Sequence, residues 1–383
     1  MSRLSQIAQQ RAISRREFLR SAALAGAGGR IFGFAPSPVI HTRPVQKTVV
    51  VTFGGGARDE ETFAPEGQEN IPHLLTELIP QATFFTQVVN HGILGHYVAT
   101  ASLATGLYEN FDNFADVAPK NPTIFEYFRK GLNRPLNDAW VIAPSNGFNR
   151  IGQSDGSRIA AGLGARVVLP KRLLSAALGQ TASSSASQFL LQDNYEDVLF
   201  TPPAAHTDEQ IGHLAELLHL SLDDFARHAA TLSSADELSV YILREVMRQF
   251  APSLVWITLH DMDVAHTGAY SLYLEGIRRS DRLCAEIWQA IETHPDYKGK
   301  TTLLILPDFG RDSDLSPAGN GFQHHRTGDP LSRTTWMMAL GPQVRQNLTV
   351  DRPLDSLDLA PTIGALMDFA TPLAQGKPAA EVL

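Results

Sequence analysis

An apolar run in the sequence ends abruptly in residues that can bind a metal ion. Residues 253–259 read as a buried strand, and Asp261, Asp263 and His266 follow it directly. In sheets of parallel strands, side chains just beyond the strand ends gather at one edge, where ligands bind. Carboxylates together with imidazole are a donor set typical of divalent cations. The segment therefore predicts a metal site at the carboxyl end of a strand.

A second run repeats the pattern. Residues 301–307 are apolar and lead into Asp308, with Arg311 shortly after and His324 and His325 in the next loop. Two strand ends and a histidine pair can converge on one cation. The ordinary alternative for each residue is a helix cap, an Asx turn or a solvated loop. The joint pattern favours the metal site, because the acids and histidines cluster at or beside apolar strand ends.

The amino terminus has the features of an export signal. Residues 14–20 (SRREFLR) form a twin-arginine motif, and the small-residue segment 21–29 is too short and too weakly apolar to span a bilayer permanently. We expect a leader over residues 1–43, the Tat translocase as its partner, and a periplasmic or otherwise exported protein. Cleavage between residues 35 and 43 and retention as an anchor both stay open.

Composition limits the class of protein. The 383 residues are 43% hydrophobic and 19% charged, which suits a soluble enzyme-sized chain with a large core. A formal charge of −8 and the lack of a basic cluster after the leader argue against nucleic acid as a partner. Cys284 is the single cysteine, so no intramolecular disulfide can form. Its place in a helical apolar pattern predicts core packing.

Strand-like and helix-like segments alternate along residues 44–383. Apolar strands are expected at 48–53, 82–89, 139–143, 253–259, 301–307 and 334–340, and an amphipathic helix at 273–291. Apolar rather than alternating strands predict an α/β fold, with a mostly parallel central sheet covered by helices on both faces. Residues 150–250, helical in pattern from 208 onward, are interpreted as an insertion or cap over the sheet.

The order of these motifs resembles the alkaline-phosphatase-like superfamily of sulfatases, phosphodiesterases and phosphomutases. The most specific piece is residues 354–368, which resemble the segment that opens the family's last helix, with Asp358 expected as its cap and Pro361 in its first turn. The resemblance implies a metal-dependent hydrolase of small anionic esters. Residues 309–311 (FGR) with the following histidine pair look closer to an exported branch of the superfamily than to true sulfatases.

The chain departs from the family pattern in one half of the expected two-metal site. The resemblance places a metal-binding Asp after the first strand, where this chain has Gly54, and a His after Asp308, where it has Phe309. The other half is kept in Asp261 or Asp263, His266, and His324 or His325. We therefore expect a single divalent ion, zinc in preference to manganese or calcium.

The nucleophile position is altered as well. The resemblance places a Ser, Thr or modified Cys about nine residues before the Thr-Gly that ends a helix, and counting back from Thr105 reaches His96. His96 is interpreted as a nucleophile, a base or an extra ligand, or as a helix-start residue bonded to backbone. Thr100, one turn deeper, is the next hydroxyl candidate after Tyr97, although packing against the helix is favoured for it.

Two functions remain open at this point. In the first, the chain is an exported hydrolase of phosphate or sulfate esters. A cation held by Asp263, His266 and His325 polarises the ester or activates water, His96 or a metal-bound hydroxide attacks, and Arg311 stabilises the anion. In the second, it is a non-catalytic relative that keeps the sheet and a structural metal and acts as an exported binding or assembly protein. The retained acids and imidazoles favour the first, because such groups are costly to gather without a cation or substrate.

Overall fold

The protein structure is a computed structural model. It describes residues 47–114, 117–144, 146–178, 216–218, 221–314 and 320–383. The twin-arginine motif and the expected leader lie outside the described residues.

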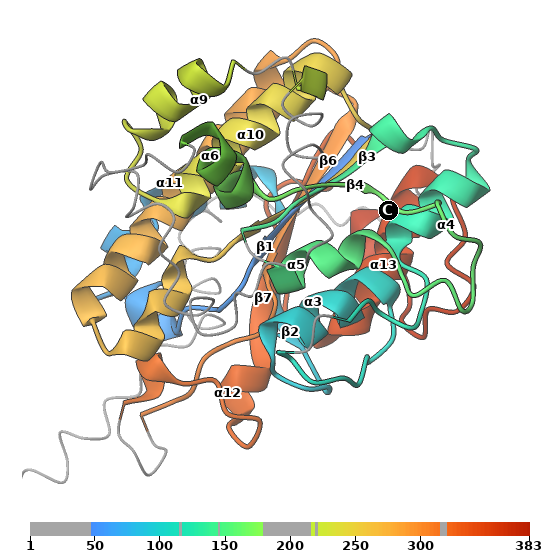
Figure 1. The fold of residues 1–383 in the computed structure, drawn as a ribbon. Helices are drawn as coiled ribbons and strands as arrows, with labels where there is room; N and C mark the ends of the chain where they lie inside the picture. The colour runs from blue at the N-terminus through green and yellow to red at the C-terminus, as the bar shows by residue number, and fades with distance from the viewer. Residues whose placement is uncertain (1–46, 115–116, 145, 179–215, 219–220, 315–319) are drawn as a thin grey trace, which may run out of the picture.

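One twisted sheet organises the described part of the chain (Figure 1). Its strands are β1 (Lys47–Phe53), β2 (Thr83–Val89), β3 (Ala139–Ile142), β4 (Arg166–Val168), β5 (Leu254–Leu259), β6 (Thr301–Pro307), β7 (Thr334–Leu340), β8 (Leu348–Val350) and β9 (Leu354–Asp355). Their order is β4-β3-β5-β1-β6-β7-β2-β8, with β9 also pairing with β2. Only β7 runs antiparallel to its neighbours among these strands. The predicted α/β class with a mostly parallel sheet is confirmed.

The strands are apolar throughout because the sheet is buried on both faces. In β1, Val49 and Val51 point into one hydrophobic core, while Val50 between them points into the other. Side chains alternate across a strand, so a strand covered on both faces needs apolar residues at every position. The unbroken run of valines therefore indicates a central strand.

Helices cover each face of the sheet. They are α3 (His96–Thr105), α4 (Ile124–Gly131), α5 (Asn146–Asn149), α6 (Pro170–Leu178), α9 (Leu222–Ala229), α10 (Ala235–Phe250), α11 (Tyr270–Thr293), α12 (Pro330–Arg333) and α13 (Leu359–Met367). Helices α10 and α11 pack on one face, and α3, α4 and α13 on the other, as Figure 1 shows. Cys284 is buried in α11 against the first of these cores, as predicted.

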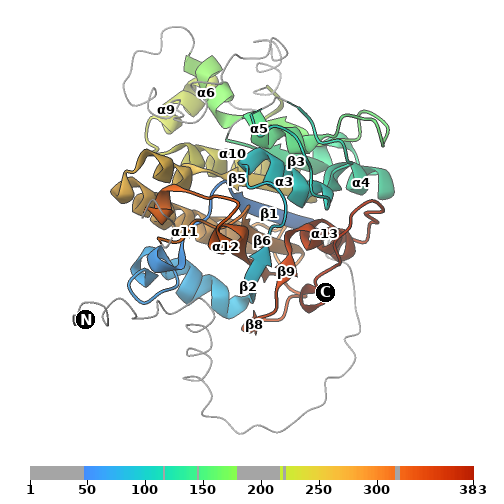
Figure 2. The same ribbon diagram turned by 90° about the horizontal axis from the view of Figure 1, so that it is seen from below.

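The range 150–250 contributes to the sheet as well as lying beside it. Within it, β4 pairs with β3 at the edge of the sheet, and α10 packs against β5 and α11. Helices α6 and α9 contact each other and lie at one end of the molecule (Figure 2). Residues 179–215 fall outside the described residues, so the limits of a separate cap stay a prediction.

The start of α13 differs from expectation. Asp358 occupies the position before the helix, but its carboxylate makes no capping bond there and instead accepts the N–H groups of Asp355 and Lys377. A short 3-10 turn precedes the helix, and Asp355 caps that turn by accepting from Leu357. The expected cap at Asp358 was wrong because the extra turn moves the first free amides upstream.

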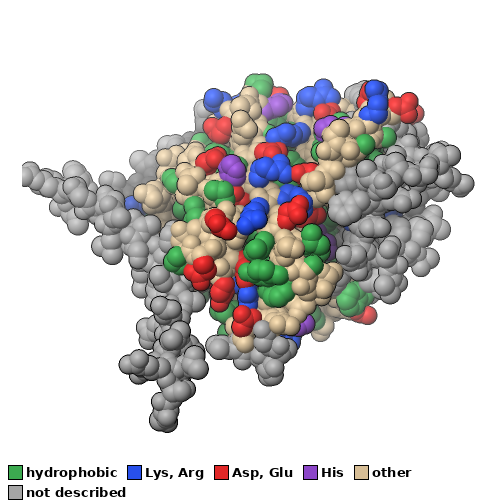
Figure 3. Space-filling model, turned by 90° about the vertical axis from the view of Figure 1, so that its left-hand side faces the viewer, with side chains coloured by type: hydrophobic (Ala, Val, Ile, Leu, Met, Phe, Trp, Pro, Cys, Tyr) green, Lys and Arg blue, Asp and Glu red, His purple; other side chains and the backbone are tan. Residues whose placement is uncertain are grey.

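Two findings bear on membrane and nucleic-acid partners: the character of the helices and the distribution of charge on one face. In the part of the chain that the structure describes, none of the helices has the length and apolar character needed to cross a bilayer. Acidic and basic side chains intermingle on the face shown in Figure 3, which gives that face no large area of a single charge.

Candidate metal centre

Three neighbouring parallel strands end at the same edge of the sheet. Strand β1 lies between β5 and β6, and all three run in the same direction. The residues that follow these three strands therefore lie close together beyond the carboxyl ends of the strands. The first residue of α3 lies at the same place. This is where ligands bind in open parallel sheets.

Four side chains converge there. His96, Asp263, His266 and His325 each offer one ligand atom, and these atoms all lie within 4.8 Å of one another. His96 is the first residue of α3, Asp263 and His266 lie in a 3-10 turn (Asp261–Thr267) after β5, and His325 follows a short turn after β6. The cluster thus joins three distant parts of the chain.

The 3-10 turn explains the spacing of two of these residues. A 3-10 helix has three residues per turn, so side chains three positions apart lie one above the other. Asp263 and His266 therefore project on the same side, and Asp263 Oδ1 lies 3.2 Å from His266 Nε2. A separation of three, rather than the four that the resemblance implied, suits this local geometry.

Asp263 is the centre of the arrangement. Its Oδ1 lies 3.3 Å from His96 Nε2 and accepts a hydrogen bond from Arg311 at 3.2 Å. Its Oδ2 lies 3.4 Å from His260 Nε2 and has no hydrogen-bond partner among the described residues. Across the cluster, the Nε2 atoms of His266 and His325 are only 2.9 Å apart.

Among the described residues, the cluster is most exposed at His266. The side chains of His96 and Asp263 are 0% and 4% exposed, whereas that of His266 is 33% exposed. His325 is intermediate between them. A small molecule from solvent would therefore reach the cluster on the side of His266, while His96 lies at its closed end.

Burial and charge set the protonation of the cluster. Burial lowers the pKa of His96, but the carboxylates of Asp263 and Asp308 outweigh it and raise the pKa to about 10. Burial raises the pKa of Asp263, yet the positive charge of His96 and the imidazole nitrogens of His260 and His266 beside it hold it well below its usual range. Burial, with the charges of His96 and Arg311, lowers the pKa of His325 to about 2. One carboxylate thus stays ionised and one imidazole stays neutral.

Asp308 and Arg311 lie next to the cluster rather than in it. Asp308 faces His96 Nδ1, the ring nitrogen on the other side from Asp263. Arg311 is buried and donates to Gly56 O at 2.7 Å and Phe322 O at 3.0 Å as well as to Asp263. Asp308 thus contacts His96, and Arg311 contacts Asp263, without either belonging to the group of four.

Three other candidates lie elsewhere. Asp261 forms an ion pair with Arg279 of α11 at 2.9 Å. His324 precedes His325 but is not part of the group of four, and its carbonyl accepts the N–H of Asp312. Thr100 is fully buried in α3, and its hydroxyl has no hydrogen-bond partner among the described residues.

Sequence reasoning missed several residues that shape the site. His260, directly after β5, faces Asp263, and its position at a strand end was an available signal. Asp236, at the start of α10, accepts the N–H groups of His260 and Asp261 at 2.7 and 2.9 Å and so holds the beginning of the turn. Phe309 stacks on the His96 ring at 4.8 Å. Asp236 carries no local signal, because an acid in the first turn of a helix is ordinary.

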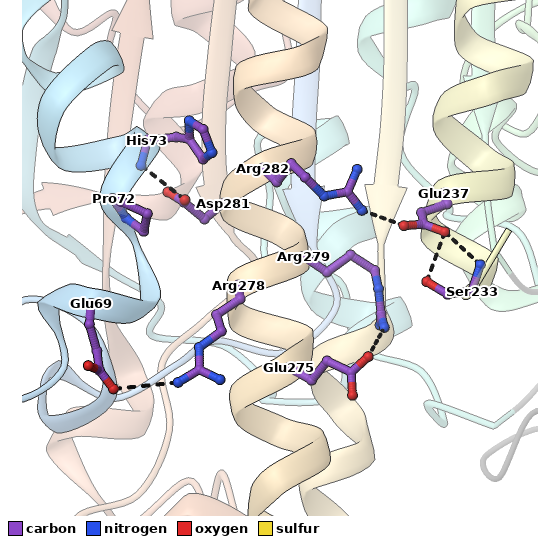
Figure 4. A pocket seen from close by; sticks show the side chains of 10 residues that line it. All are labelled: Glu69, Pro72, His73, Ser233, Glu237, Glu275, Arg278, Arg279, Asp281 and Arg282. Atoms are coloured by element: carbon purple, nitrogen blue, oxygen red, sulfur yellow. Dashed lines mark hydrogen bonds and ion pairs between the residues drawn. The ribbon is translucent and has the colours of Figure 1, made fainter.

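A separate cavity of about 390 Å³ lies along α11 (Figure 4). None of its lining residues belongs to the cluster. Its three arginines already bond to carboxylates: Arg278 to Glu69, Arg279 to Glu275 and Asp261, and Arg282 to Glu237 and Glu286. The arginines of the cavity are therefore all paired with carboxylates, and the cluster beyond β5, β1 and β6 is the stronger candidate site.

Similarity to known proteins is found in the fold. No protein-family model matches the sequence, and no curated protein matches it. Among solved structures, the phosphonate monoester hydrolase SpPMH from Silicibacter pomeroyi is 13% identical with a TM-score of 0.54, over 87% of this chain and 76% of that one. The alkaline phosphatase PafA is 10% identical with a TM-score of 0.54, over 90% and 100%. Murine ectonucleotide pyrophosphatase/phosphodiesterase 5 is 14% identical with a TM-score of 0.50, over 87% and 97%.

Proposed function

We propose that this chain, whose fold is that of the alkaline phosphatase superfamily, is an exported hydrolase of phosphate or sulfate esters that works with a single divalent cation. His96, Asp263, His266 and His325 would hold the ion. The observation that carries the proposal is the convergence of these four ligand atoms within 4.8 Å at the ends of three parallel strands.

The residues fit a cation on chemical grounds. Three imidazole nitrogens and one carboxylate oxygen suit zinc, which takes such donors and can expand from four to five ligands when a substrate joins. His266 Nε2 and His325 Nε2 lie close enough for one to donate to the other, and an ion between them would take both nitrogens as ligands in place of that hydrogen bond. The buried Asp263 Oδ2, without a hydrogen bond from the described residues, is a further atom that an ion would satisfy.

The chain's own residues suit an anionic ester. A bound divalent cation would supply Lewis-acid polarisation of the ester. Helix α3 begins at the cluster, and the amino end of a helix favours negative charge. His266 borders the open side, so the substrate would enter past it and leave His96 at the closed end.

The structural neighbours support the substrate class. By their names, one hydrolyses phosphonate monoesters and another is an alkaline phosphatase. The common feature of these two proteins is a small anionic ester as substrate, and this is the substrate class that we propose.

Export is proposed on the twin-arginine motif at 14–20, which implies the Tat translocase and a periplasmic location.

A second candidate function rests on a specific observation. The start of α3 presents His96 rather than a hydroxyl or thiol, and Arg311 is buried with three of its donors engaged by the protein. Neither residue is placed to do what a covalent nucleophile or a solvent-facing anion clamp does. A non-catalytic exported protein with a structural metal would account for both features.

Assays of ester hydrolysis separate the two functions. The mature protein is tested on chromogenic phosphate monoesters, phosphate diesters and sulfate esters, with and without added zinc or manganese. The hydrolase predicts metal-dependent turnover that His266→Ala reduces by at least about a hundredfold. His228→Ala, an exposed histidine on α9, is the control and should keep full turnover. Metal binding without turnover on any ester would favour the second function.

A further inference from the structure

Asp308 is held in a way that does not suit a metal ligand. It is 1% exposed and comes directly after β6. Its Oδ1 accepts the N–H of Gly55 at 3.1 Å and of Phe309 at 2.9 Å. Its Oδ2 faces His96 Nδ1 at 2.7 Å. Both oxygens are thus occupied by N–H groups of the protein.

We propose that Asp308 is a positioning residue, which fixes the His96 ring so that its Nε2 faces the shared ligand position. The inference rests on the proposed single-metal function and assigns Asp308 a role other than that of a ligand. A carboxylate that accepts from Nδ1–H keeps the proton on that nitrogen and leaves Nε2 to coordinate.

The surroundings of His96 fix the ring in the same orientation. Phe309 stacks on one face of the imidazole with an angle of 20° between the planes. Asp263 lies on the Nε2 side at 3.3 Å, and Asp308 on the Nδ1 side. The ring therefore bridges the two carboxylates, and a flipped ring would place carbon atoms against both of them. The hydrogen bond to Asp308 decides which nitrogen keeps its proton when a cation binds, because ligand binding displaces the proton on the other.

The glycine loop makes this arrangement possible. Gly55 adopts a φ of +110°, which places its N–H toward Asp308 and is strained for other residues. A Cβ at Gly56 would lie 2.3 Å from Phe309 O. The close approach of this loop to the end of β6 thus supplies one of the two amides that orient the Asp308 carboxylate.

Asp308→Asn is the informative substitution, because it keeps the size of the side chain and changes its hydrogen-bonding pattern. If the amide oxygen stays with the N–H groups of Gly55 and Phe309, the amide nitrogen presents hydrogens to His96 Nδ1. His96 must then accept there and carry its proton on Nε2, where it blocks coordination. The reverse orientation sets the amide hydrogens against two backbone N–H groups. That second arrangement is disfavoured, so the first, in which Nε2 carries the proton, is expected to dominate.

A double-mutant cycle tests whether Asp308 acts through His96. Zinc affinity is measured by competition with a chromogenic chelator for wild type, Asp308→Asn, His96→Gln and the double variant. We expect Asp308→Asn to weaken zinc binding by about 10- to 100-fold in the wild-type background, and to have no further effect when His96 is already Gln. An equal loss in both backgrounds would overturn the inference, because Asp308 would then act on the ion directly or through the fold.

A matched control and a spectroscopic measurement complete the test. Asp138→Asn replaces another buried aspartate, one that accepts from Ser253 at the opposite end of β5, and should leave zinc affinity unchanged. In metal-free protein labelled with ¹⁵N-histidine, the His96 Nδ1 proton should be visible and slow to exchange, and Asp308→Asn should remove it. Its absence from wild type would overturn the hydrogen bond itself. A wild type that shows this proton but binds no zinc would instead overturn the metal role in both proposals.

Discussion

Asp263 is the residue around which the candidate site is built. One of its oxygens faces His96, His266 and Arg311, so a single buried carboxylate is surrounded by nitrogen donors. Its pKa lies well below the usual range, because the charge of His96 and the surrounding hydrogen bonds outweigh its burial. The carboxylate is therefore ionised and ready to bind a cation at any physiological pH.

Arg311 is expected to stabilise this carboxylate rather than the substrate. Replacing it with Lys keeps the charge but cannot satisfy Gly56 O, Phe322 O and Asp263 at once, because an ammonium lacks the planar fork of donors. We predict that Arg311→Lys lowers the free energy of unfolding by roughly 2–4 kcal/mol and weakens zinc binding. Urea denaturation and chelator competition measure the two effects.

The control for Arg311 is Arg278→Lys, at an arginine whose side chain is 51% exposed. It should change the free energy of unfolding by less than about 1 kcal/mol. If Arg311→Lys keeps both stability and zinc affinity but raises KM for an ester, Arg311 would be a substrate-binding residue, and the present assignment would be refuted.

The sequence could not decide between the two aspartates after β5. Both Asp261 and Asp263 follow a buried strand, and the spacing of four residues before His266 that the family resemblance implied falls on Met262. The 3-10 geometry of the turn aligns Asp263 with His266 and sends Asp261 toward Arg279. The direction of the Asp261 side chain depends on Arg279 of α11. The sequence around Arg279 gave no sign of this ion pair.

At the scale of the elements, the end of β1 explains why the chain lacks an acid there. A Cβ at Gly54 would lie 2.4 Å from Phe148 Cζ and 2.7 Å from His260 Cδ2. Those two rings fill the space that a side chain would take. The chain turns tightly at these glycines, where Gly55 has a positive φ. The crowding by Phe148 and His260 depends on tertiary packing and could not be predicted from the sequence.

Helix α11 is joined to the short helix Leu74–Leu78 by one buried carboxylate. Asp281 accepts the N–H of Leu74 at 2.7 Å and of His73 at 3.0 Å, and burial raises its pKa from 3.8 to about 6. The folded protein then holds this proton at pH values where the unfolded chain has lost it. The resulting stabilisation is present below about pH 4 and is lost as the pH rises through about 6.

Asp281→Asn should remove this pH dependence. We predict that the stability of wild type relative to Asp281→Asn falls by on the order of 2 kcal/mol between pH 4 and pH 7. Urea denaturation of both proteins across that range measures the difference and cancels groups that titrate in both. A difference that stays constant or increases with pH would show that the folded-state pKa of Asp281 is not raised.

At the scale of the whole molecule, the sequence predicted the architecture well. The six expected strands are present, and the mostly parallel sheet follows from apolar runs that are buried on both faces. The place of His96 beside Asp263 could not be derived from spacing, since 167 residues separate them in the sequence. Only the family resemblance pointed to His96, and it left the role of the ring open.

Export is a property of the whole chain that the leader is expected to confer. We predict that residues 1–43 fused to a folded fluorescent reporter direct it out of the cytoplasm, and that changing Arg15 and Arg16 to Lys prevents this. Cell fractionation measures the distribution. The same fusion in cells without the Tat translocase is the control. Export that survives both changes would contradict a twin-arginine signal.

The most direct test of the central claim is the zinc content of purified protein, measured by elemental analysis in wild type, His325→Ala and His324→Ala. These neighbouring histidines have the same chemistry, but only His325 belongs to the cluster. The account predicts about one zinc ion per chain in wild type and in His324→Ala, and little zinc in His325→Ala. Two ions per wild-type chain, no bound ion, or loss of zinc only in His324→Ala would contradict it.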